Sequence, residues 1–425
     1  MAVPEARSGA ALMITAKVLL AAGLVIVVVR LVGWLVARLG QPRVIGEIVA
    51  GILLGPSVLG LVWPQARALL FPSGVIDGFQ VLAQFGLVLF MLLVGMELDG
   101  RLLRGQGRRS AAISLVSVAI PFGLGAGLGV LLYPQFGTGT GTGPGRMAFC
   151  LFIGAAVAIT AFPVLVRILQ ETGLYHTRVG AMAIACAAID DVIAWCLLAV
   201  VVAAAGAGGP AEVTGHIAGT VGFVLFMVKV VRPLLARPAR LPFWVTLVVA
   251  FLSAWATETI GIHAIFGAFL AGLVMPRRPE WQDQVRVRLS GVVDAFVLPM
   301  FFVVVGMSTR IDQLDSWQSA GVVVLVTVTA IAGKLGGATI AARSMRERWP
   351  VALSIGVLMN TRGLTEIVIL TVGLQLGVID TRLFTVLVIM ALVTTAMAAP
   401  LLRLLSRSDA VSAATAARPH AVVRH

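Results

Sequence analysis

Long apolar runs, separated by short polar stretches, follow one another along this chain of 425 residues. Such runs are long enough to cross the hydrocarbon core of a bilayer, about 30 Å thick, as helices. The pattern therefore predicts an all-α integral membrane protein with about thirteen transmembrane helices. The predicted segments are 11–36, 44–61, 79–98, 110–133, 147–169, 179–205, 215–231, 241–257, 260–276, 289–308, 318–341, 350–375 and 381–404.

The composition agrees with this prediction. Hydrophobic residues make up 59% of the chain and charged residues 12%, whereas soluble domains carry about 25% charged residues. The three cysteines, Cys150, Cys186 and Cys196, stand in apolar runs without a CxxC motif, so they are read as small core residues. We find no nucleophile motif and no metal-ligand spacing, so neither an enzyme nor a cofactor is expected.

Basic residues concentrate in every second predicted loop. RLLRGQGRR (101–109), RPLLARPAR (232–240), RRPEWQDQVRVR (277–288) and RSMRER (343–348) all fall on one side. That side holds about 23 of the 32 basic residues and the other side about five, so the positive-inside rule makes the rich side cytoplasmic. The formal net charge of +13 is thereby explained by topology, and a nucleic-acid partner is not expected.

This orientation fixes the expected domain organisation. Residues 1–10 form an extracytoplasmic tail, residues 11–405 form the transmembrane domain, and residues 406–425 form a short basic cytoplasmic tail. The expected location is the inner membrane, with the N-terminus outside and the C-terminus inside.

Two stretches recur along the chain. LVLFMLLVGMELD (87–99) resembles VLPMFFVVVGMSTRID (297–312), and EIVAGILLGP (47–56) resembles AFLAGLVMP (268–276). The copies are seven predicted spans apart, an odd number, so they cross the membrane in opposite directions. Inverted repeats of this kind are typical of secondary transporters with a site at the bilayer midplane. The predicted halves are roughly residues 44–205 and 260–405.

Two predicted spans contain residues that interrupt helices. ITAFPVL (159–165) places a proline within a span, and LMNTRGLTE (358–366) places Asn, Thr, Arg and Gly there. Unwound backbone at membrane depth survives where it is buried in protein or lines a cavity. A simple proline kink beside a polar patch is the alternative. The residues expected to line a broken-helix site are Thr160, Ala161, Phe162, Pro163, Asn360, Thr361, Arg362 and Glu366.

Adjacent carboxylates occur in the apolar stretch AAIDDVIAWCLLAVVV (187–202). Neighbouring helical residues point about 100° apart, so Asp190 and Asp191 cannot both face one cavity. One of them is expected to hold a proton or a small cation alternately, while Lys334 neutralises the other. Arg362 and Glu366 stand four residues apart and could pair across one turn. A buried ion-pair cluster that only fixes helix packing is the competing interpretation.

At these residues the chain resembles the bacterial monovalent cation:proton antiporter-2 family. The matching stretches are GEIVAGILLGPSVLG (46–60), LFMLLVGMELD (89–99), TAFPVLVRIL (160–169), AAIDDVIAWCLLA (187–199), HAIFGAFLAGLVMP (263–276), LPMFFVVVGM (298–307), GKLGGA (333–338) and MNTRGLTEIVIL (359–370). The resemblance implies a homodimer, in which a core domain with two crossed broken helices moves against a dimerisation domain.

The resemblance also suggests roles for individual residues. It implies that Asp191 is the main ion and proton carrier and that Asp190 pairs with Lys334, as in electrogenic members. Asp191 and the hydroxyl of Thr160 are the candidate alkali-cation ligands. The expected function is exchange of Na⁺, or of Li⁺ or K⁺, for protons, and one such task is pH homeostasis.

Several alternatives stay open at this stage. MNTRGLTE (359–366) also resembles plant cation/H⁺ exchangers, which favours K⁺. Several relatives carry a nucleotide-binding regulatory domain after the spans, and none is expected in the short tail here. Functions of other classes are a passive cation channel, although no TVGYG-like filter occurs, and an organic-anion carrier, which the acidic site disfavours.

Overall fold

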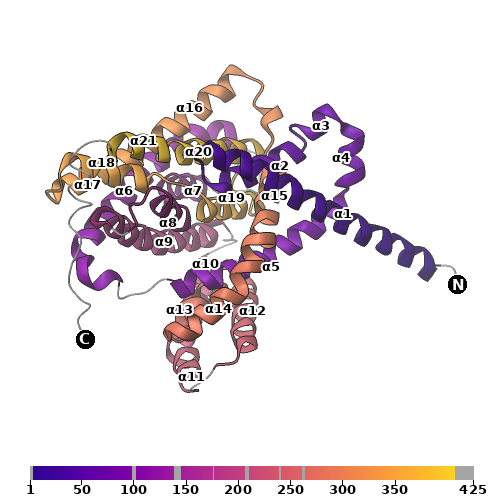
Figure 1. Ribbon diagram of the computed structural model, residues 1–425, viewed down its shortest axis with the longest axis horizontal. Helices are drawn as coiled ribbons and strands as arrows, with labels where there is room; N and C mark the ends of the chain where they lie inside the picture. Colours follow the sequence, from indigo (N-terminus) through magenta and orange to yellow (C-terminus); the bar gives the residue numbers. More distant parts are fainter. Residues whose placement is uncertain are drawn as a thin grey trace. The chain divides into compact units, whose positions relative to one another are not determined.

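The fold of the chain is described from a computed structural model (Figure 1). It describes residues 3–97, 102–137, 145–175, 177–205, 210–238, 241–260 and 264–406, all of which lie in helices or the turns between them. The chain divides into two compact units. Unit 1 comprises Met1–Leu39, Arg43–Asp99 and Gly206–Gln313, and unit 2 comprises Gly40–Pro42, Gly100–Ala205 and Leu314–His425.

The helices of each unit come from both halves of the chain. Unit 1 contains α1 (Val3–Arg38), α2 (Arg43–Leu54), α3 (Leu59–Val62), α4 (Pro64–Leu70), α5 (Ser73–Glu97), α10 (Pro210–Phe226), η1 (Met227–Val231), α11 (Arg232–Ala236), α12 (Phe243–Ile260), α13 (Ala264–Val274), α14 (Pro279–Val292), η2 (Val293–Val297), α15 (Leu298–Ser308) and η3 (Ile311–Gln313). Unit 2 contains α6 (Leu102–Phe136), α7 (Arg146–Ala158), α8 (Phe162–Glu171), α9 (Arg178–Ala205), α16 (Trp317–Ile331), η4 (Ala332–Gly336), α17 (Gly337–Ser344), α18 (Trp349–Met359), α19 (Leu364–Gln375), α20 (Thr381–Ala396) and α21 (Ala398–Ser406). The segments η1, η2 and η4 are single π-helical turns inside longer helices.

Two close helix crossings, each made by a pair of glycines, organise unit 1. A Cβ atom on Gly51 of α2 would lie 2.9 Å from the Cα of Gly306 in α15, and one on Gly306 would lie 2.7 Å from the Cα of Gly51. Gly95 of α5 and Gly272 of α13 meet in the same way, with 3.0 Å from a Cβ on Gly95 to the Cα of Gly272. Because these distances are shorter than real side chains allow, only glycine fits at the four positions.

Most of the predicted spans correspond to helices. Over the described residues, ten helices are long and apolar enough to cross a membrane, and Arg146–Ala158, Ala264–Val274, Trp349–Met359 and Thr365–Gln375 are shorter apolar helices. The shorter helices fall in the predicted segments 147–169, 260–276 and 350–375. The all-helical fold is confirmed, and the number of thirteen crossings stays a prediction.

Several helix boundaries differ from the predictions. Helix α1 begins at Val3, so most of the predicted tail 1–10 is helical. Helix α6 begins at Leu102, so the basic stretch 101–109 largely belongs to a helix. Helix α11 extends the predicted span 215–231 to Ala236. In each case a helix continues past the apolar run, because backbone hydrogen bonding does not stop where hydrophobicity does. The basic tail lies beyond the described residues, apart from Ser406.

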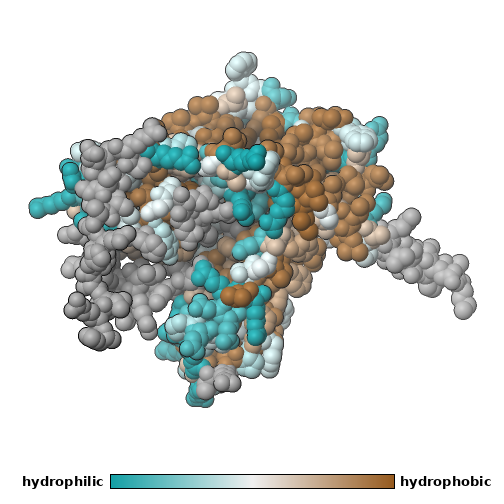
Figure 2. All heavy atoms as spheres, in the orientation of Figure 1, coloured by the Kyte–Doolittle hydropathy of each residue, from teal (hydrophilic) through white to brown (hydrophobic). Residues whose placement is uncertain are grey.

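The surface carries many large apolar side chains. Figure 2 shows them as a broad apolar area over α2 to α5 of unit 1. Six tryptophans are more than half exposed, each close to a helix end: Trp34, Trp63, Trp244, Trp255, Trp317 and Trp349. Exposed tryptophan is typical of the boundary between a bilayer and water.

Candidate functional site

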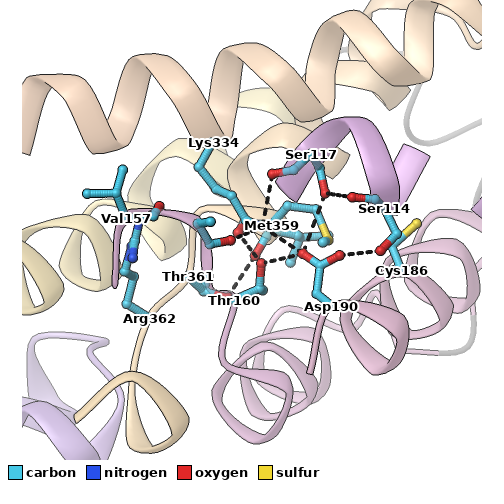
Figure 3. A network of polar contacts seen from close by, with 12 residues as sticks. Ser114, Ser117, Val157, Thr160, Cys186, Asp190, Lys334, Met359, Thr361 and Arg362 are labelled. Atoms are coloured by element: carbon cyan, nitrogen blue, oxygen red, sulfur yellow. Dashed lines mark hydrogen bonds and ion pairs between the residues drawn. The ribbon is translucent and has the colours of Figure 1, made fainter. Parts of the chain in front are cut away.

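Two interrupted helices meet inside unit 2. The first interruption, residues 159–161, separates α7 from α8, and the second, residues 360–363, separates α18 from α19. The backbone N–H of Ala161 donates to the carbonyl of Thr361 at 3.1 Å. The Thr160 hydroxyl lies 2.8 Å from the carbonyl of Met359. The sequence predicted both breaks, and the structure shows that they contact each other (Figure 3).

Local sequence explains why the helices stop there. Pro163 stands at the second position of α8, where its missing N–H is not needed for the helix ladder. Gly363 precedes α19, and a Cβ atom there would press against Val164 and Ala161 of the other broken segment. Thr395 of α20 holds the second break, because its hydroxyl donates to the carbonyl of Arg362 at 2.6 Å and accepts from its N–H at 3.0 Å.

Asp190, in the middle of α9, is buried and contacted by side chains from α6, from η4 and from the break before α8 (Figure 3). Its Oδ1 accepts a hydrogen bond from the Ser114 hydroxyl of α6. Its Oδ2 lies 3.0 Å from the hydroxyl of Thr160 and 2.6 Å from the ammonium of Lys334. The Ser117 hydroxyl lies 3.5 Å from the same oxygen. Ser114 and Lys334 therefore donate to the carboxylate, while the single hydroxyl proton of Thr160 has both this carboxylate and the Met359 carbonyl within reach.

Lys334 lies on the π turn η4 and is completely buried. Besides Asp190, its ammonium donates to the carbonyl of Ala158 at 2.6 Å and to the carbonyl of Ser117 at 3.1 Å. An ammonium has three N–H donors, so each of them has an acceptor. The predicted pair of Lys334 with Asp190 is present, and it is anchored to the end of α7 as well.

Asp191 differs from its neighbour. Its side chain is completely buried, and among the described residues neither carboxyl oxygen has a hydrogen-bond partner. A buried carboxylate without partners is costly, so this group favours binding a cation or a proton.

Arg362 and Glu366 form a second buried ion pair. Nη1 of Arg362 lies 3.1 Å from Oε1 of Glu366, and both side chains are fully buried. The guanidinium also donates to the carbonyls of Ala156 and Val157, in the last turn of α7. The predicted pairing across one helical turn is present, together with backbone contacts that the sequence did not reveal.

The remaining predicted residues line the breaks without contacting the aspartates through hydrogen bonds described here. Phe162 is buried at the start of α8, and the Thr361 hydroxyl donates to the carbonyl of Leu358 at 2.7 Å. The amide nitrogen of Asn360 lies 3.7 Å from the sulfur of Met397. Thr160 faces Asp190 rather than Asp191, and its role as a cation ligand stays a prediction.

Sequence reasoning missed the hydroxyl groups of α6. Ser110, Ser114 and Ser117 are spaced four and three residues apart, which places them on one helix face. That spacing within an apolar run was a signal for polar neighbours. Among the described residues, no group of three or more His, Cys, Asp or Glu side chains could hold a metal ion.

Comparisons with known proteins agree with this geometry. A family model described as "Sodium/hydrogen exchanger, transmembrane" matches residues 24–405. The Na(+)/H(+) antiporter NhaS4 of Synechocystis sp. is 39% identical over 402 residues, which cover 92% of this chain and 96% of that protein. Cation/H(+) antiporter 19 of Arabidopsis thaliana is 37% identical over 397 residues, covering 90% of this chain and 48% of that protein.

Two further relatives widen the comparison. K(+)/H(+) antiporter 1 of Saccharomyces cerevisiae is 32% identical over 399 residues, covering 90% of this chain and 45% of that protein. The chain thus spans about half the length of these plant and yeast relatives. The solved structure of the sodium proton antiporter MjNhaP1 from Methanocaldococcus jannaschii matches with a TM-score of 0.64 and 16% identity, covering 95% of this chain and 100% of that one. The structural match shows a shared fold.

Proposed function

Because this chain belongs to the sodium/hydrogen exchanger family, we propose that it exchanges a monovalent cation for protons by alternating access, with Asp191 as the carrier. It is a multi-pass membrane protein and a transporter rather than an enzyme. The exchanged cation is Na⁺ in this proposal, with Li⁺ and K⁺ as alternatives, because similar proteins are named both Na(+)/H(+) and K(+)/H(+) antiporters.

The contrast between the two aspartates carries the proposal. Asp190 is bonded to Ser114, Thr160 and Lys334, while both carboxyl oxygens of Asp191 lack hydrogen-bond partners among the described residues. A carboxylate in this state can hold either a proton or a small hard cation, but not both strongly. Competition for one site, combined with access from alternate sides, is sufficient for exchange.

The charges of the cluster support the same conclusion. Its buried ionisable side chains comprise the carboxyl groups of Asp190, Asp191 and Glu366 and the cations of Lys334 and Arg362. When all of them are ionised, the cluster carries one uncompensated negative charge. Because an isolated buried charge is costly, a single proton or monovalent cation at Asp191 neutralises the cluster as long as Lys334 stays protonated.

The exchange is proposed to be electrogenic. Lys334 is a second buried group that can release a proton when a cation binds at Asp191, next to the partner of Lys334, Asp190. One cation would then be exchanged for more than one proton. The π turn that carries Lys334 is a helical defect of the kind often found at functional sites.

The arrangement of unit 1 supports inverted repeats as part of this proposal. The sequence alignment pairs Gly51 with Gly272 and Gly95 with Gly306. In the structure Gly51 packs on Gly306, and Gly95 packs on Gly272. Exchanging the two repeats converts one crossing into the other, which is what a pseudo-two-fold relationship requires. Unit 2 has one broken helix from each proposed repeat, 44–205 and 260–405.

We assign unit 2, which holds the breaks, to the moving core and unit 1 to dimerisation. The chain is proposed to work as a homodimer in the inner membrane, with the N-terminus outside and the C-terminus in the cytoplasm. With that orientation, Trp34, Trp244 and Trp349 lie near the cytoplasmic boundary, while Trp63, Trp255 and Trp317 lie near the outer one. Tryptophan at both boundaries is typical of membrane proteins.

The test uses everted vesicles containing a pH-sensitive dye and a proton gradient built by respiration. NaCl, LiCl or KCl is then added to vesicles with the wild-type chain, Asp191→Asn or Asp190→Asn. Dequenching with the wild type and none with Asp191→Asn would support exchange at Asp191, and the most effective salt identifies the cation. Equal dequenching with the wild type and Asp191→Asn would remove Asp191 as the carrier. No response to any alkali cation would favour the organic-anion reading.

A further inference from the structure

The guanidinium of Arg362 occupies the end of a half-helix in the way that an alkali cation would. It is completely buried and is contacted by the carbonyls of Ala156 and Val157 and by Oε1 of Glu366. The two carbonyls belong to the last turn of α7, the negative end of that helix dipole. Backbone carbonyls at half-helix ends together with a carboxylate are ligands that transporters use for alkali cations.

The fit between this oxygen cluster and the guanidinium is incomplete. Nε of Arg362 and Oε2 of Glu366 are buried without hydrogen-bond partners among the described residues. A guanidinium and a carboxylate can pair through two parallel hydrogen bonds, but here one contact is made and the second nitrogen turns to a carbonyl. The carbonyls of Ala156 and Val157 and the carboxylate of Glu366 therefore compensate the positive charge of Arg362, but they do not match all the hydrogen-bonding positions of its guanidinium.

Lys334, on η4, can be compared with Arg362, because its ammonium binds a carbonyl in the same last turn of α7. Its ammonium binds the next carbonyl, that of Ala158, and the carboxylate of Asp190, and all three of its donors have acceptors. The last three carbonyls of α7 are thus shared by two tethered cations, each accompanied by a carboxylate. The cluster around Arg362 differs in that one carboxylate oxygen, Oε2 of Glu366, has no hydrogen-bond partner among the described residues, and a smaller cation could use it.

We propose that Arg362 is a tethered cation filling a second alkali-cation site, made by the carbonyls of Ala156 and Val157 and the carboxylate of Glu366. By occupying this site permanently, the side chain limits the protein to one transported cation, bound at Asp191. Removing the side chain opens the site to Na⁺ or K⁺. The limit to one cation rests on the proposed exchange function, whereas the second site itself does not.

The test is carried out in an Asp191→Asn background, so that the proposed transport site contributes nothing. Purified Asp191→Asn and Arg362→Ala/Asp191→Asn are heated in NaCl, KCl, guanidinium chloride at low concentration, or choline chloride of equal ionic strength. The expected result is a Tm of the double variant that rises with the logarithm of the Na⁺ or K⁺ concentration. Asp191→Asn alone should show no such rise, and guanidinium should also stabilise the double variant.

Two further variants distinguish a cation site from a purely structural role of Arg362 in capping α7. Adding Glu366→Gln to the double variant removes the only carboxylate of the site and should abolish the cation-dependent shift of the Tm. Arg362→Lys in the Asp191→Asn background keeps a tethered cation and should remain insensitive to Na⁺. A purely structural cap predicts equal Tm values of Arg362→Ala/Asp191→Asn in all salts, and that result would overturn the proposal.

Failure to obtain folded Arg362→Ala would also test the proposed second cation site. If Arg362→Ala cannot be recovered folded in sodium, potassium or guanidinium, the proposal is wrong, because an external cation should replace the missing one. Proton-coupled transport by the wild type is measured separately. A cation-dependent Tm in the double variant, without any exchange by the wild type, would retain the second site and reject the proposed exchange function.

Discussion

Asp190 and Asp191 are consecutive residues of α9, yet Asp190 is bonded to Ser114, Thr160 and Lys334 while Asp191 has no hydrogen-bond partner among the described residues. Both side chains are buried to a similar degree. The difference therefore comes from direction, since adjacent residues on a helix point about 100° apart. One aspartate faces a set of donors, and the other faces none among the described residues.

Ser114→Ala should lower the thermal stability of the protein measurably. The serine hydroxyl donates to the buried carboxylate of Asp190, and a hydrogen bond to a charged group contributes about 1.5–3 kcal/mol. We expect a lower Tm in detergent. Ser110→Ala is the matched control, because the Ser110 hydroxyl lies on the same face and has no hydrogen-bond partner among the described residues. Equal Tm values for the two variants would show that the Ser114 contact contributes nothing.

Lys334→Met should be strongly destabilising, because it leaves Asp190 charged, buried and without its cation. Breaking a buried ion pair on one side costs about 3–5 kcal/mol. The double variant Asp190→Asn/Lys334→Met removes both charges and should regain part of the lost free energy of unfolding. Thermal unfolding of the wild type, Asp190→Asn, Lys334→Met and the double variant forms a complete double-mutant cycle. Additive effects would argue against direct coupling of the two residues.

Alanine at Gly51 or at Gly95 should destabilise unit 1 to a similar extent. In both cases the added methyl group meets the backbone of the partner helix, and overpacking of this kind typically costs about 1–3 kcal/mol. Gly23→Ala in α1 provides the control, since a Cβ atom there has nothing within 4 Å and alanine is the better helix former. A Gly23→Ala effect as large as the other two would point to helix propensity rather than close packing.

Electrogenic exchange should charge a closed vesicle. In proteoliposomes loaded with Na⁺ and diluted into Na⁺-free buffer, more than one proton enters for each Na⁺ that leaves. A potential-sensitive dye should therefore report a positive interior that a protonophore abolishes. A pH change with no potential would establish electroneutral exchange and remove Lys334 as a second proton carrier.

The topology can be tested with fusion proteins. Alkaline phosphatase fused after Gly145 should be active, because this position lies in a predicted outer loop, whereas a fusion after Arg348 should be inactive. Green fluorescent protein at the C-terminus should fluoresce in the cytoplasm. The reverse pattern at both positions would invert the proposed orientation, and mixed results would alter the number of crossings between them.

The fold and the main ion pair were predictable from local sequence. Apolar run length predicted the helices, and the residues Pro163 and Gly363 marked the two breaks because they disrupt regular hydrogen bonding. Elimination among the deeply placed cations indicated that Lys334 pairs with one of the two aspartates, and the family resemblance implied that this aspartate is Asp190. The helices, the breaks and the choice of Lys334 depend on residue type and spacing alone.

Other features of the site depend on which backbone atoms meet, and sequence patterns do not encode this. The carbonyls of Ala156 and Val157 accept from Arg362, but any residue would supply the same carbonyl. The contact of Thr160 with Asp190 instead of Asp191 likewise depends on the rotation of α9. The hydroxyl of Ser114 was visible in the sequence, yet its partner is 76 residues away.

The long separation between Asp190 and Lys334 also affects how the protein is made. The two residues are 144 positions apart, so a ribosome adding about 5–20 residues per second needs roughly 7–30 seconds to reach the lysine after the aspartate. During that interval α9 has two carboxyl groups and no lysine partner. The nascent helix must therefore be shielded within the insertion machinery, or carry protons on its aspartates, until Lys334, about four-fifths of the way along the chain, has been synthesised.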